Sequence, residues 1–515
     1  MFPKFHLFLI IIILLSGCAV NPVTGKKDFV IVGEKWELET GEKQYSPLRQ
    51  SQGGDYIVDG ELTEYISQVG QRLAAVSDRE LPYEFKVLNN SVPNAWALPG
   101  GKISINRGLL TELKSESELA AVLAHEIVHA AAKHGAHGMT KGVFLQTAAI
   151  GVALATKDED YGKWAQAGAS IGAQLVNQKY GRDAERESDH YGMLYMSRAG
   201  YDLQGAVDLQ RTFLALHEEK EPNWIEGLFA SHPPSQERLQ NNLEMLTTMP
   251  QGGEIGRERY HAKTVHLFKT KPAYDAFDEA RKALNDGDTA TAKGLAQHAI
   301  ELEPKEAIFY GLLGDIEQKS QNRQKALQHY SKAINLNPDY FYHYLQRGKI
   351  NEELNLPENA QADLERSVAL LPTADAYYLL GNLSRDAGEN TLAIDYYSKV
   401  MDSKSGLSKQ AYGDLVELDL ANNPAKYIKI EKTWQNDQGA IVAEINNPTP
   451  KDVSGVNLAV TFKDKAGRKG SLKVLLGGRV SAEETTLFDL GIAERLVKEN
   501  ATEYQLQIIG ASVAD

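Results

Sequence analysis

Cysteine is nearly absent from this chain, since Cys18 is the only one among 515 residues. A single cysteine excludes an intramolecular disulfide, and it also excludes metal sites built from four cysteines or from two cysteines and two histidines. A bound metal must therefore be held by carboxylates and by some of the 13 histidines.

An excess of positive charge is missing as well, because 69 acidic residues outnumber 55 lysines and arginines and give a formal net charge of −14. Such a chain has no overall field that attracts phosphate, so we expect no nucleic-acid partner. The mean hydropathy of −0.37 excludes a protein with many membrane spans. Ordinary contents of apolar residues (42%) and charged residues (24%) exclude wholesale disorder. The length predicts about three domains.

Long apolar runs are missing except near the N-terminus, where Leu7 to Leu15 is unbroken. This run is too short to span a bilayer, and with Lys4 before it the run has the length of a signal-peptide core. It ends in Leu15-Ser16-Gly17-Cys18, which resembles a bacterial lipobox. A plain secretory signal with an incidental cysteine is the alternative. The lipoprotein interpretation is favoured because the only cysteine stands where lipidation requires one.

The lipobox resemblance implies a signal peptide over residues 1–17, cleavage before Cys18 and acyl chains that anchor the protein. Residues 18–30 are then a short tether. Ala19 follows in place of Asp, which by resemblance to sorted lipoproteins implies the outer membrane. We therefore expect a periplasmic protein of a Gram-negative bacterium that contacts the membrane through its lipid anchor only.

A repeat of about 34 residues runs through residues 273–406. Prolines and alanines recur with this step, at Pro304, Pro338 and Pro372 and at Ala292, Ala326, Ala360 and Ala393. The period is that of tetratricopeptide repeats, whose stacked helix pairs form a concave surface for a protein partner. The predicted repeats are 273–306, 307–340, 341–373 and 374–406, with a capping helix at 408–424. A non-repetitive helical domain with chance prolines is the alternative, but it does not explain several classes of position in one register.

Residues 425–515 form a third region with alternating strands. Val456, Leu458, Val460 and Phe462 alternate with more polar residues, and turn signals separate such runs. The expectation is a small all-β, sandwich-like domain without catalytic chemistry.

The remaining region, residues 31–262, contains the candidate site. Ser115 and Glu118 form a capping-box signature before an apolar helix, which we expect to run to His134 and to stop at Gly135. Within it, His125-Glu-Ile-Val-His129 places two histidines on one helix face, where they can hold zinc. Glu126 is close enough to act on a water without ligating the metal. The alternative is a surface helix that carries two histidines by chance.

A catalytic zinc needs a third protein ligand. A metzincin has a histidine for this purpose ten residues after the first one, but position 135 of this chain is Gly, so that class is excluded. His134 lies nearly opposite His125 on a helix, so we expect it to be solvated or to interact with the helix C-terminus. Glu185 and Asp189 share a helix face, and one of them could bind zinc while the other orients a histidine. A merely solvated charge cluster is the alternative to this assignment.

These motifs together resemble the gluzincin family of HtpX, the CAAX prenyl proteases and the BepA-like metalloproteases. The resemblance covers about residues 20–245 and implies that Glu185 is the third ligand, with Asp189 supporting a histidine. Arg182 also matches the family pattern and is expected to support the site, whereas Ser188 stands where Ala is usual. One zinc ion per chain is implied.

Two further segments resemble this family. Residues 94–101 match the extended edge that borders the cleft, so Asn94, Ala95, Trp96 and Ala97 are expected to bind the substrate chain. An ordinary hairpin with an exposed Trp96 is the alternative. Ser231-His232-Pro233-Pro234 resembles a loop whose histidine approaches the metal. His232 is expected either to stabilise the oxyanion or to latch the zinc site shut.

The sequence therefore predicts a multidomain protein with a mostly helical α+β gluzincin domain, an all-α tetratricopeptide solenoid and a C-terminal all-β domain. The expected function is hydrolysis of misfolded or unassembled envelope proteins, with Glu126 as general base. The first alternative is a tetratricopeptide chaperone or assembly adaptor with a latched or vestigial protease. A zinc-stabilised structural domain ranks last, because it would not need Glu126.

Overall fold

The computed structural model describes residues 18–30, 32–140, 180–219, 232–403, 405–498 and 501–514. The predicted signal peptide at residues 1–17 lies outside the described residues. The chain divides into two compact units, residues 1–350 and residues 351–515. Among the described helices, none combines the length and the apolar character that a bilayer crossing requires.

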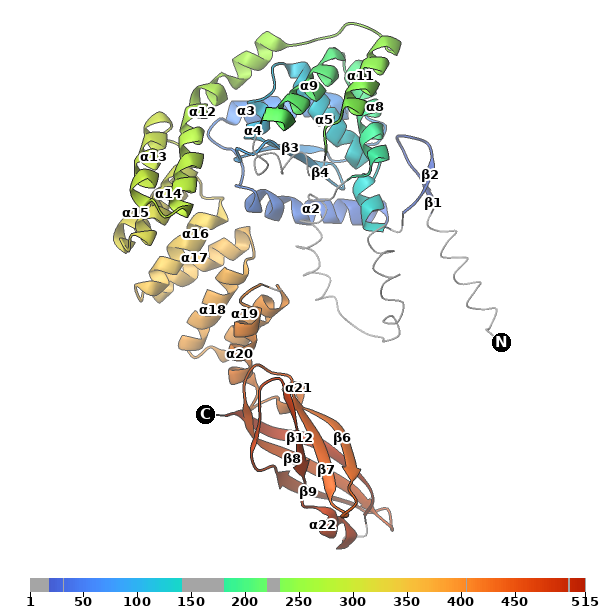
Figure 1. Ribbon diagram of the computed structural model, residues 1–515, viewed down its shortest axis with the longest axis vertical. Coiled ribbons are helices and arrows are strands. Elements are labelled where there is room, and N and C mark those ends of the chain that lie inside the picture. Colours follow the sequence, from blue (N-terminus) through green and yellow to red (C-terminus); the bar gives the residue numbers. More distant parts are fainter. Residues whose placement is uncertain are drawn as a thin grey trace, which may run out of the picture. The chain divides into compact units, whose positions relative to one another are not determined.

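A three-stranded sheet lies inside the N-terminal unit (Figure 1). Strand β3 (Glu84–Leu88) runs parallel to β5 (Lys102–Asn106), and β4 (Ala95–Leu98) pairs antiparallel with β5 at one edge. Gly100 and Gly101 make the tight turn from β4 to β5 with φ of 81° and 84°, values that residues with a Cβ rarely adopt. Strand β4 is thus an edge strand of this sheet, and it contains Ala95, Trp96 and Ala97 of the predicted substrate edge.

Helices cover both faces of this sheet. Helix α2 (Glu34–Ser51) packs on one face, and α3 (Gly60–Ala74) and α5 (Glu116–Ala131) pack on the other (Figure 1). Helices α8 (Arg182–Arg198) and α9 (Gln204–Glu219) pack against α5, and α11 (Gln236–Thr248) packs against α8 and α9. The smaller elements are the hairpin of β1 (Cys18–Val20) and β2 (Lys27–Phe29) and the short helix α4 (Arg107–Leu110). Helix α5 is thus the buried central element of the unit.

The start of α5 agrees with the sequence, and its end does not. The Ser115 side chain accepts a hydrogen bond from the backbone N–H of Glu118 at 3.1 Å, as the capping signature predicts. The helix ends at Ala131, however, and a turn follows in which Lys133 has a φ of 62°. The prediction that the helix runs to His134 and stops at Gly135 is therefore wrong, because a lysine takes the left-handed position that the sequence pattern assigns to glycine.

Antiparallel helix pairs follow the sheet domain along the chain. Within residues 1–350 these pairs are built from α12 (Arg257–Asn285), α13 (Thr289–Leu302), α14 (Ala307–Lys319) and α15 (Arg323–Leu336), and α16 (Phe341–Glu353) crosses into the second unit. The second unit continues with α17 (Pro357–Leu370), α18 (Ala374–Asp386), α19 (Asn390–Asp402) and α20 (Ser408–Asp419). The four alanines of the repeat are fully buried where the helices of these pairs meet.

One glycine of the repeat provides a test of this helix packing. A Cβ at Gly314 would lie 2.5 Å from the ring of Tyr330 on the paired helix. We therefore expect Gly314→Ala to lower the free energy of unfolding by about 1–3 kcal/mol, the usual cost of overpacking. Gly294→Ala in α13 is the matched control, because nothing lies within 4 Å of its Cβ and alanine favours a helix. Urea unfolding followed by circular dichroism measures both, and equal stabilities would contradict the packing.

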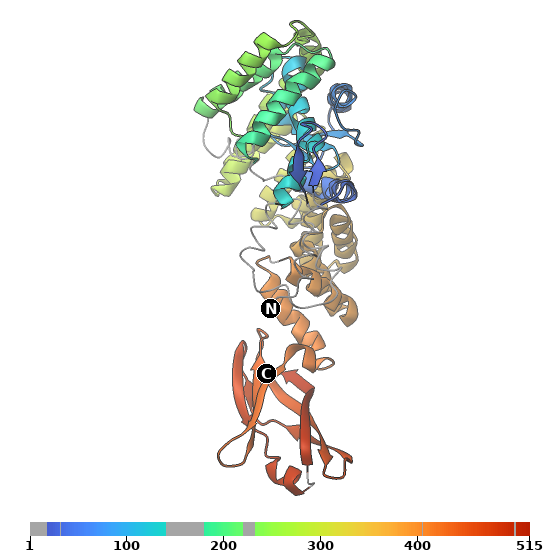
Figure 2. The same ribbon diagram turned by 90° about the vertical axis from the view of Figure 1, so that its right-hand side faces the viewer.

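The C-terminal strands form two antiparallel sheets (Figure 2). One has β8 (Val453–Asp464) between β10 (Arg479–Val480) and β12 (Ala501–Val513), with β9 (Lys469–Leu475) also paired to β8. The other has β7 (Ile441–Asn447) between β6 (Lys429–Gln435) and β11 (Glu484–Asp489). Two short helices, α21 (Pro424–Tyr427) and α22 (Ala493–Lys498), accompany them. Alternate residues of β7 and β8 are buried in one shared hydrophobic cluster, as the alternation predicts.

Candidate active site

Side chains of α5 and α8 meet in the interior of the N-terminal unit. His125 and His129 come from α5, and Glu185 comes from the first turn of α8. The two helices approach closely because α8 carries a glycine at the contact: a Cβ at Gly192 would lie 3.3 Å from the backbone nitrogen of His125. This packing brings Glu185 to the two histidines, although 55 residues lie between His129 and Glu185 in the sequence.

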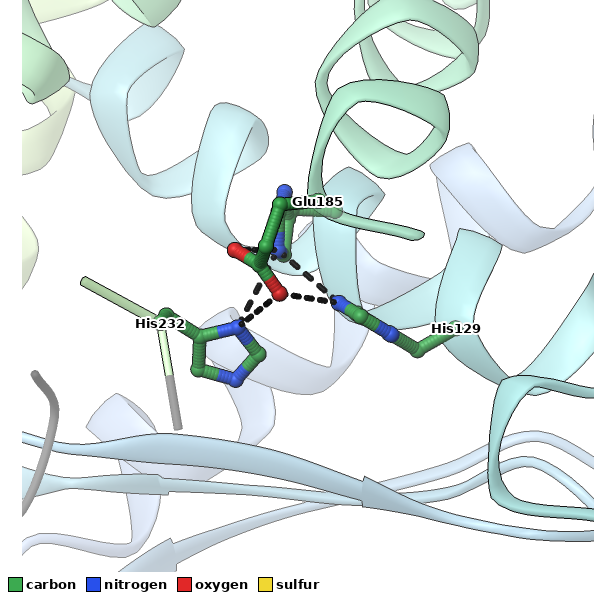
Figure 3. Close-up of side chains that lie close together, drawn as sticks. His129, Glu185 and His232 are labelled. Carbon is green, nitrogen blue, oxygen red and sulfur yellow. Dashed lines mark hydrogen bonds and ion pairs between the residues drawn. The ribbon is translucent and has the colours of Figure 1, made fainter. Parts of the chain in front are cut away.

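Four donor atoms converge at this point (Figure 3). The Nε2 atoms of His125 and His129 are 3.0 Å apart, and His129 Nε2 is 3.5 Å from Glu185 Oε1. His232 Nδ1 completes the group at 3.0 Å from Glu185 Oε1 and 3.4 Å from His125 Nε2. All four residues are buried.

This group fits a zinc ion. Zinc holds nitrogen and oxygen donors tetrahedrally at about 2.0–2.1 Å, which places the donors about 3.3 Å from one another. The observed separations scatter around that value. Burial also holds the pKa of His129 well below its ordinary value, so the ring is neutral, which is the form that binds a metal. Three imidazole nitrogens and a carboxylate are a donor set that suits zinc.

Asp189 and Arg238 contact the residues of this cluster without being donors themselves. Asp189 Oδ1 lies 3.0 Å from His125 Nδ1, so the other nitrogen of that ring faces the donors. Arg238 from α11 donates to both oxygens of Asp189 at 2.7 Å and lies 2.9 Å from Glu185 Oε2. Burial alone would raise the pKa of Asp189, but Arg238 and His125 outweigh it and keep the pKa below its usual value.

The arginine of the family pattern is placed differently. Arg182 begins α8 and is exposed, and among the described residues no hydrogen bond or ion pair joins it to the cluster. Arg238 instead makes the contacts to Asp189 and Glu185. The assignment of Arg182 as a supporting residue thus does not agree with the structure, because the first turn of α8 directs this side chain to solvent.

Glu126 lies beside the donors without being one of them. Its Oε1 is 3.6 Å from His232 Nε2, and its Oε2 is buried with no hydrogen-bond partner among the described residues. Burial raises the pKa of this carboxyl group above its ordinary value. A buried carboxylate oxygen that lacks a partner can accept a proton from a molecule that enters the site.

The space next to Glu126 is small. A cavity of about 30 Å³ is lined by Ala95, His125, Glu126, Ser188 and His232, among others. Such a volume holds only one or two water molecules. Ser188, which departs from the family pattern, adds a buried hydroxyl without a partner among the described residues.

The predicted substrate-binding segment borders this cavity. Ala95 lines it, and β4 is an edge strand of the described sheet. Asn94 and Ala97 are also buried, and the backbone oxygen of Asn94 accepts a hydrogen bond from Asn106. Trp96 is buried as well and donates to Gln52 Oε1 at 3.1 Å, so the alternative of an exposed tryptophan is wrong.

Two side chains at the cluster were not assigned to it from the sequence. His134 is buried, with Nδ1 at 2.9 Å from His129 Nδ1, so the expectation that it is solvated is wrong. The ring of Tyr180 packs 4.0 Å from that of His129, centroid to centroid. Neither side chain has a signal in the sequence, because the place of His134 depends on the end of α5 at Ala131 and on the left-handed Lys133, which the sequence pattern does not predict.

Parts of this chain are similar to known peptidases and to known repeat proteins. Residues 61–246 match the model of peptidase family M48, and residues 277–341 and 345–406 match that of the tetratricopeptide repeat. The mitochondrial metalloendopeptidase OMA1 of Schizosaccharomyces pombe is 31% identical over 229 residues, which are 44% of this chain and 65% of that protein. The putative beta-barrel assembly-enhancing protease of Vibrio cholerae is 28% identical over 47% of this chain and 50% of that protein.

A third relative matches a larger share of this chain. The beta-barrel assembly-enhancing protease of Escherichia coli is 26% identical over 356 residues, which are 62% of this chain and 72% of that protein. The chain thus spans less than two thirds of the length of the yeast and Vibrio relatives.

Proposed function

Because residues 61–246 are a peptidase family M48 domain and tetratricopeptide repeats follow it, we propose that the protein is a zinc metalloendopeptidase. The convergence of His125, His129, Glu185 and His232 beside the unpartnered carboxylate of Glu126 carries this proposal. His125, His129 and Glu185 are the proposed zinc ligands, with one zinc ion per chain.

The proposed mechanism is hydrolysis of a peptide bond by water. Zinc, when bound, supplies positive charge that polarises the scissile carbonyl and acidifies the attacking water. Glu126 accepts a proton from that water as its oxygen attacks the carbonyl carbon. Glu126 then delivers the proton to the amide nitrogen as the C–N bond breaks, which leaves a carboxylic acid and an amine. Asp189 keeps His125 oriented throughout.

The proposed substrate is an unfolded or misassembled protein chain. Strand β4 can pair with an extended segment through main-chain hydrogen bonds, which depend little on sequence. This supports the assignment of Asn94, Ala95, Trp96 and Ala97 as the substrate edge, with their backbone rather than their side chains making contact.

The resting enzyme is proposed to be latched by His232. This histidine supplies the fourth donor of the cluster, and the remaining cavity has room only for water. A catalytic zinc site keeps its fourth position open, whereas four protein donors make a closed site. The alternative, in which His232 stabilises the oxyanion, requires it to stand back from the metal.

The proposed location is the periplasmic face of the outer membrane. The lipobox-like segment that ends at Cys18 supports a lipid anchor, and the segment up to residue 17 lies outside the described residues. Two relatives are named as beta-barrel assembly-enhancing proteases, which supports a role in the quality control of outer-membrane proteins. A protein partner would then bind the groove of the repeats.

A tetratricopeptide assembly adaptor is the second candidate, and the small cavity favours it over an open peptidase. The deciding experiment combines casein cleavage and zinc content on one preparation that lacks residues 1–18. We expect one zinc per chain and slow cleavage that a chelator abolishes. Absence of zinc would contradict the proposal. Zinc without cleavage would favour the adaptor or a permanently closed latch.

A further inference from the structure

His134 lies directly behind one of the proposed zinc ligands. Helix α5 ends at Ala131, and the left-handed residue Lys133 turns the chain so that the imidazole of His134 comes to lie beneath His129. A non-glycine residue in this conformation costs about 1–2 kcal/mol. The turn therefore persists because the contacts that follow it, including the buried ring of His134, stabilise it.

The hydrogen bond between the rings of His129 and His134 has a defined donor and a defined acceptor. His129 Nε2 faces the other donors, at 3.0 Å from His125 Nε2, so a bound metal would occupy this nitrogen's lone pair. The proton of the neutral ring is then on Nδ1, which lies 2.9 Å from Nδ1 of His134. His134 must accept this proton's hydrogen bond and must itself carry its proton on Nε2.

The second nitrogen of His134 also has a partner. His134 Nε2 lies 3.4 Å from Glu187 Oε2, and the other oxygen of Glu187 accepts from Lys26 Nζ at 3.2 Å. The Glu187 side chain is 24% exposed and that of Lys26 is 71% exposed. Exposed ion pairs contribute little to stability, so the contact between Lys26 and Glu187 adds little here. The contacts that matter are those of His134 with His129 and with Glu187.

We infer that His134 is a positioning residue that orients the zinc ligand His129, with Glu187 fixing its tautomer. The two histidines of α5 are then held in different ways. His125 donates directly to the carboxylate of Asp189, whereas His129 donates to a neutral imidazole with a carboxylate one step further away. Groups that orient a ligand imidazole affect metal affinity, although they do not touch the metal. The inference rests on the proposed zinc ligation by His129.

The test measures zinc affinity of the full chain by competition with a chromophoric chelator. His134→Leu removes the acceptor, and we expect it to weaken zinc binding by about 10- to 100-fold. His134→Asn restores an acceptor oxygen at the position of Nδ1, so its affinity should return close to that of the wild type. Glu187→Ala should cause a smaller loss. His190→Leu, at an exposed site on α8, is the control.

Glu185→Ala separates this inference from the proposed function. If the wild type binds no zinc, or if Glu185→Ala binds it equally well, the proposed site itself fails. If Glu185→Ala loses zinc while His134→Leu does not, only the role of His134 is overturned. An asparagine variant as weak as the leucine variant also overturns it. Thermal unfolding without metal shows whether a variant at His134 fails to fold. If one does, the zinc affinity of Glu187→Ala decides, and an affinity equal to that of the wild type overturns the inference.

Discussion

Replacing Glu126 with glutamine is expected to abolish peptide hydrolysis and to leave the zinc content at one ion per chain. Glutamine has nearly the same shape but cannot accept the proton of the attacking water. General bases contribute about 100- to 10,000-fold to rates, so a loss of that size is expected. Metal should remain because Glu126 is not among the four donors, and its Oε2 has no hydrogen bond to lose among the described residues.

Casein cleavage and zinc content are measured on the same samples of the wild type and of Glu126→Gln. Glu258→Gln is the control, since it changes an exposed carboxylate on α12. The comparison is repeated with His232→Ala present, so that slow cleavage by a latched wild type does not hide the loss. Full activity of Glu126→Gln in either background would contradict the assignment of Glu126 as the base.

The local features of the site could be predicted from sequence because each depends on residues close together in the chain. The i, i+4 spacing of His125 and His129 places them on one face of any helix. The capping signature at Ser115 sets the helix start through contacts within three residues. The alternation of β7 and β8 and the repeat of buried alanines likewise follow from period and burial alone.

The supporting residues could not be predicted in this way. Arg238 reaches Asp189 only because α11 packs against α8, a contact between segments 49 residues apart. Sequence reasoning instead selected Arg182, which is close in the chain but exposed. The position of His134 depends on a left-handed lysine at 133, a strained choice that no propensity predicts when Gly135 stands nearby.

Replacing His232 with alanine is expected to accelerate casein cleavage by about tenfold or more. In the structure His232 Nδ1 takes a place among the zinc donors, and the cavity left beside Glu126 is about 30 Å³. Pockets that bind drug-sized ligands have volumes of about 300–1,000 Å³, so a peptide cannot enter without a movement. His232 is the donor that comes from neither α5 nor α8, and it is therefore the side chain that can withdraw while the other donors stay.

The size of the acceleration gives the free-energy difference between the closed form, in which His232 is bound at the donor cluster, and the open form. If only a fraction of the wild-type molecules is open, the observed rate is reduced by that fraction, and a tenfold rise corresponds to about 1.4 kcal/mol in favour of the closed form. Zinc content should persist on His125, His129 and Glu185, and His190→Ala on the exposed face of α8 should leave the rate unchanged. The oxyanion role predicts the opposite result, since loss of such a donor lowers kcat by about 100- to 1,000-fold. A fall in rate with zinc retained would therefore overturn the latch and assign His232 to the transition state, so the sign of the change decides between the two roles.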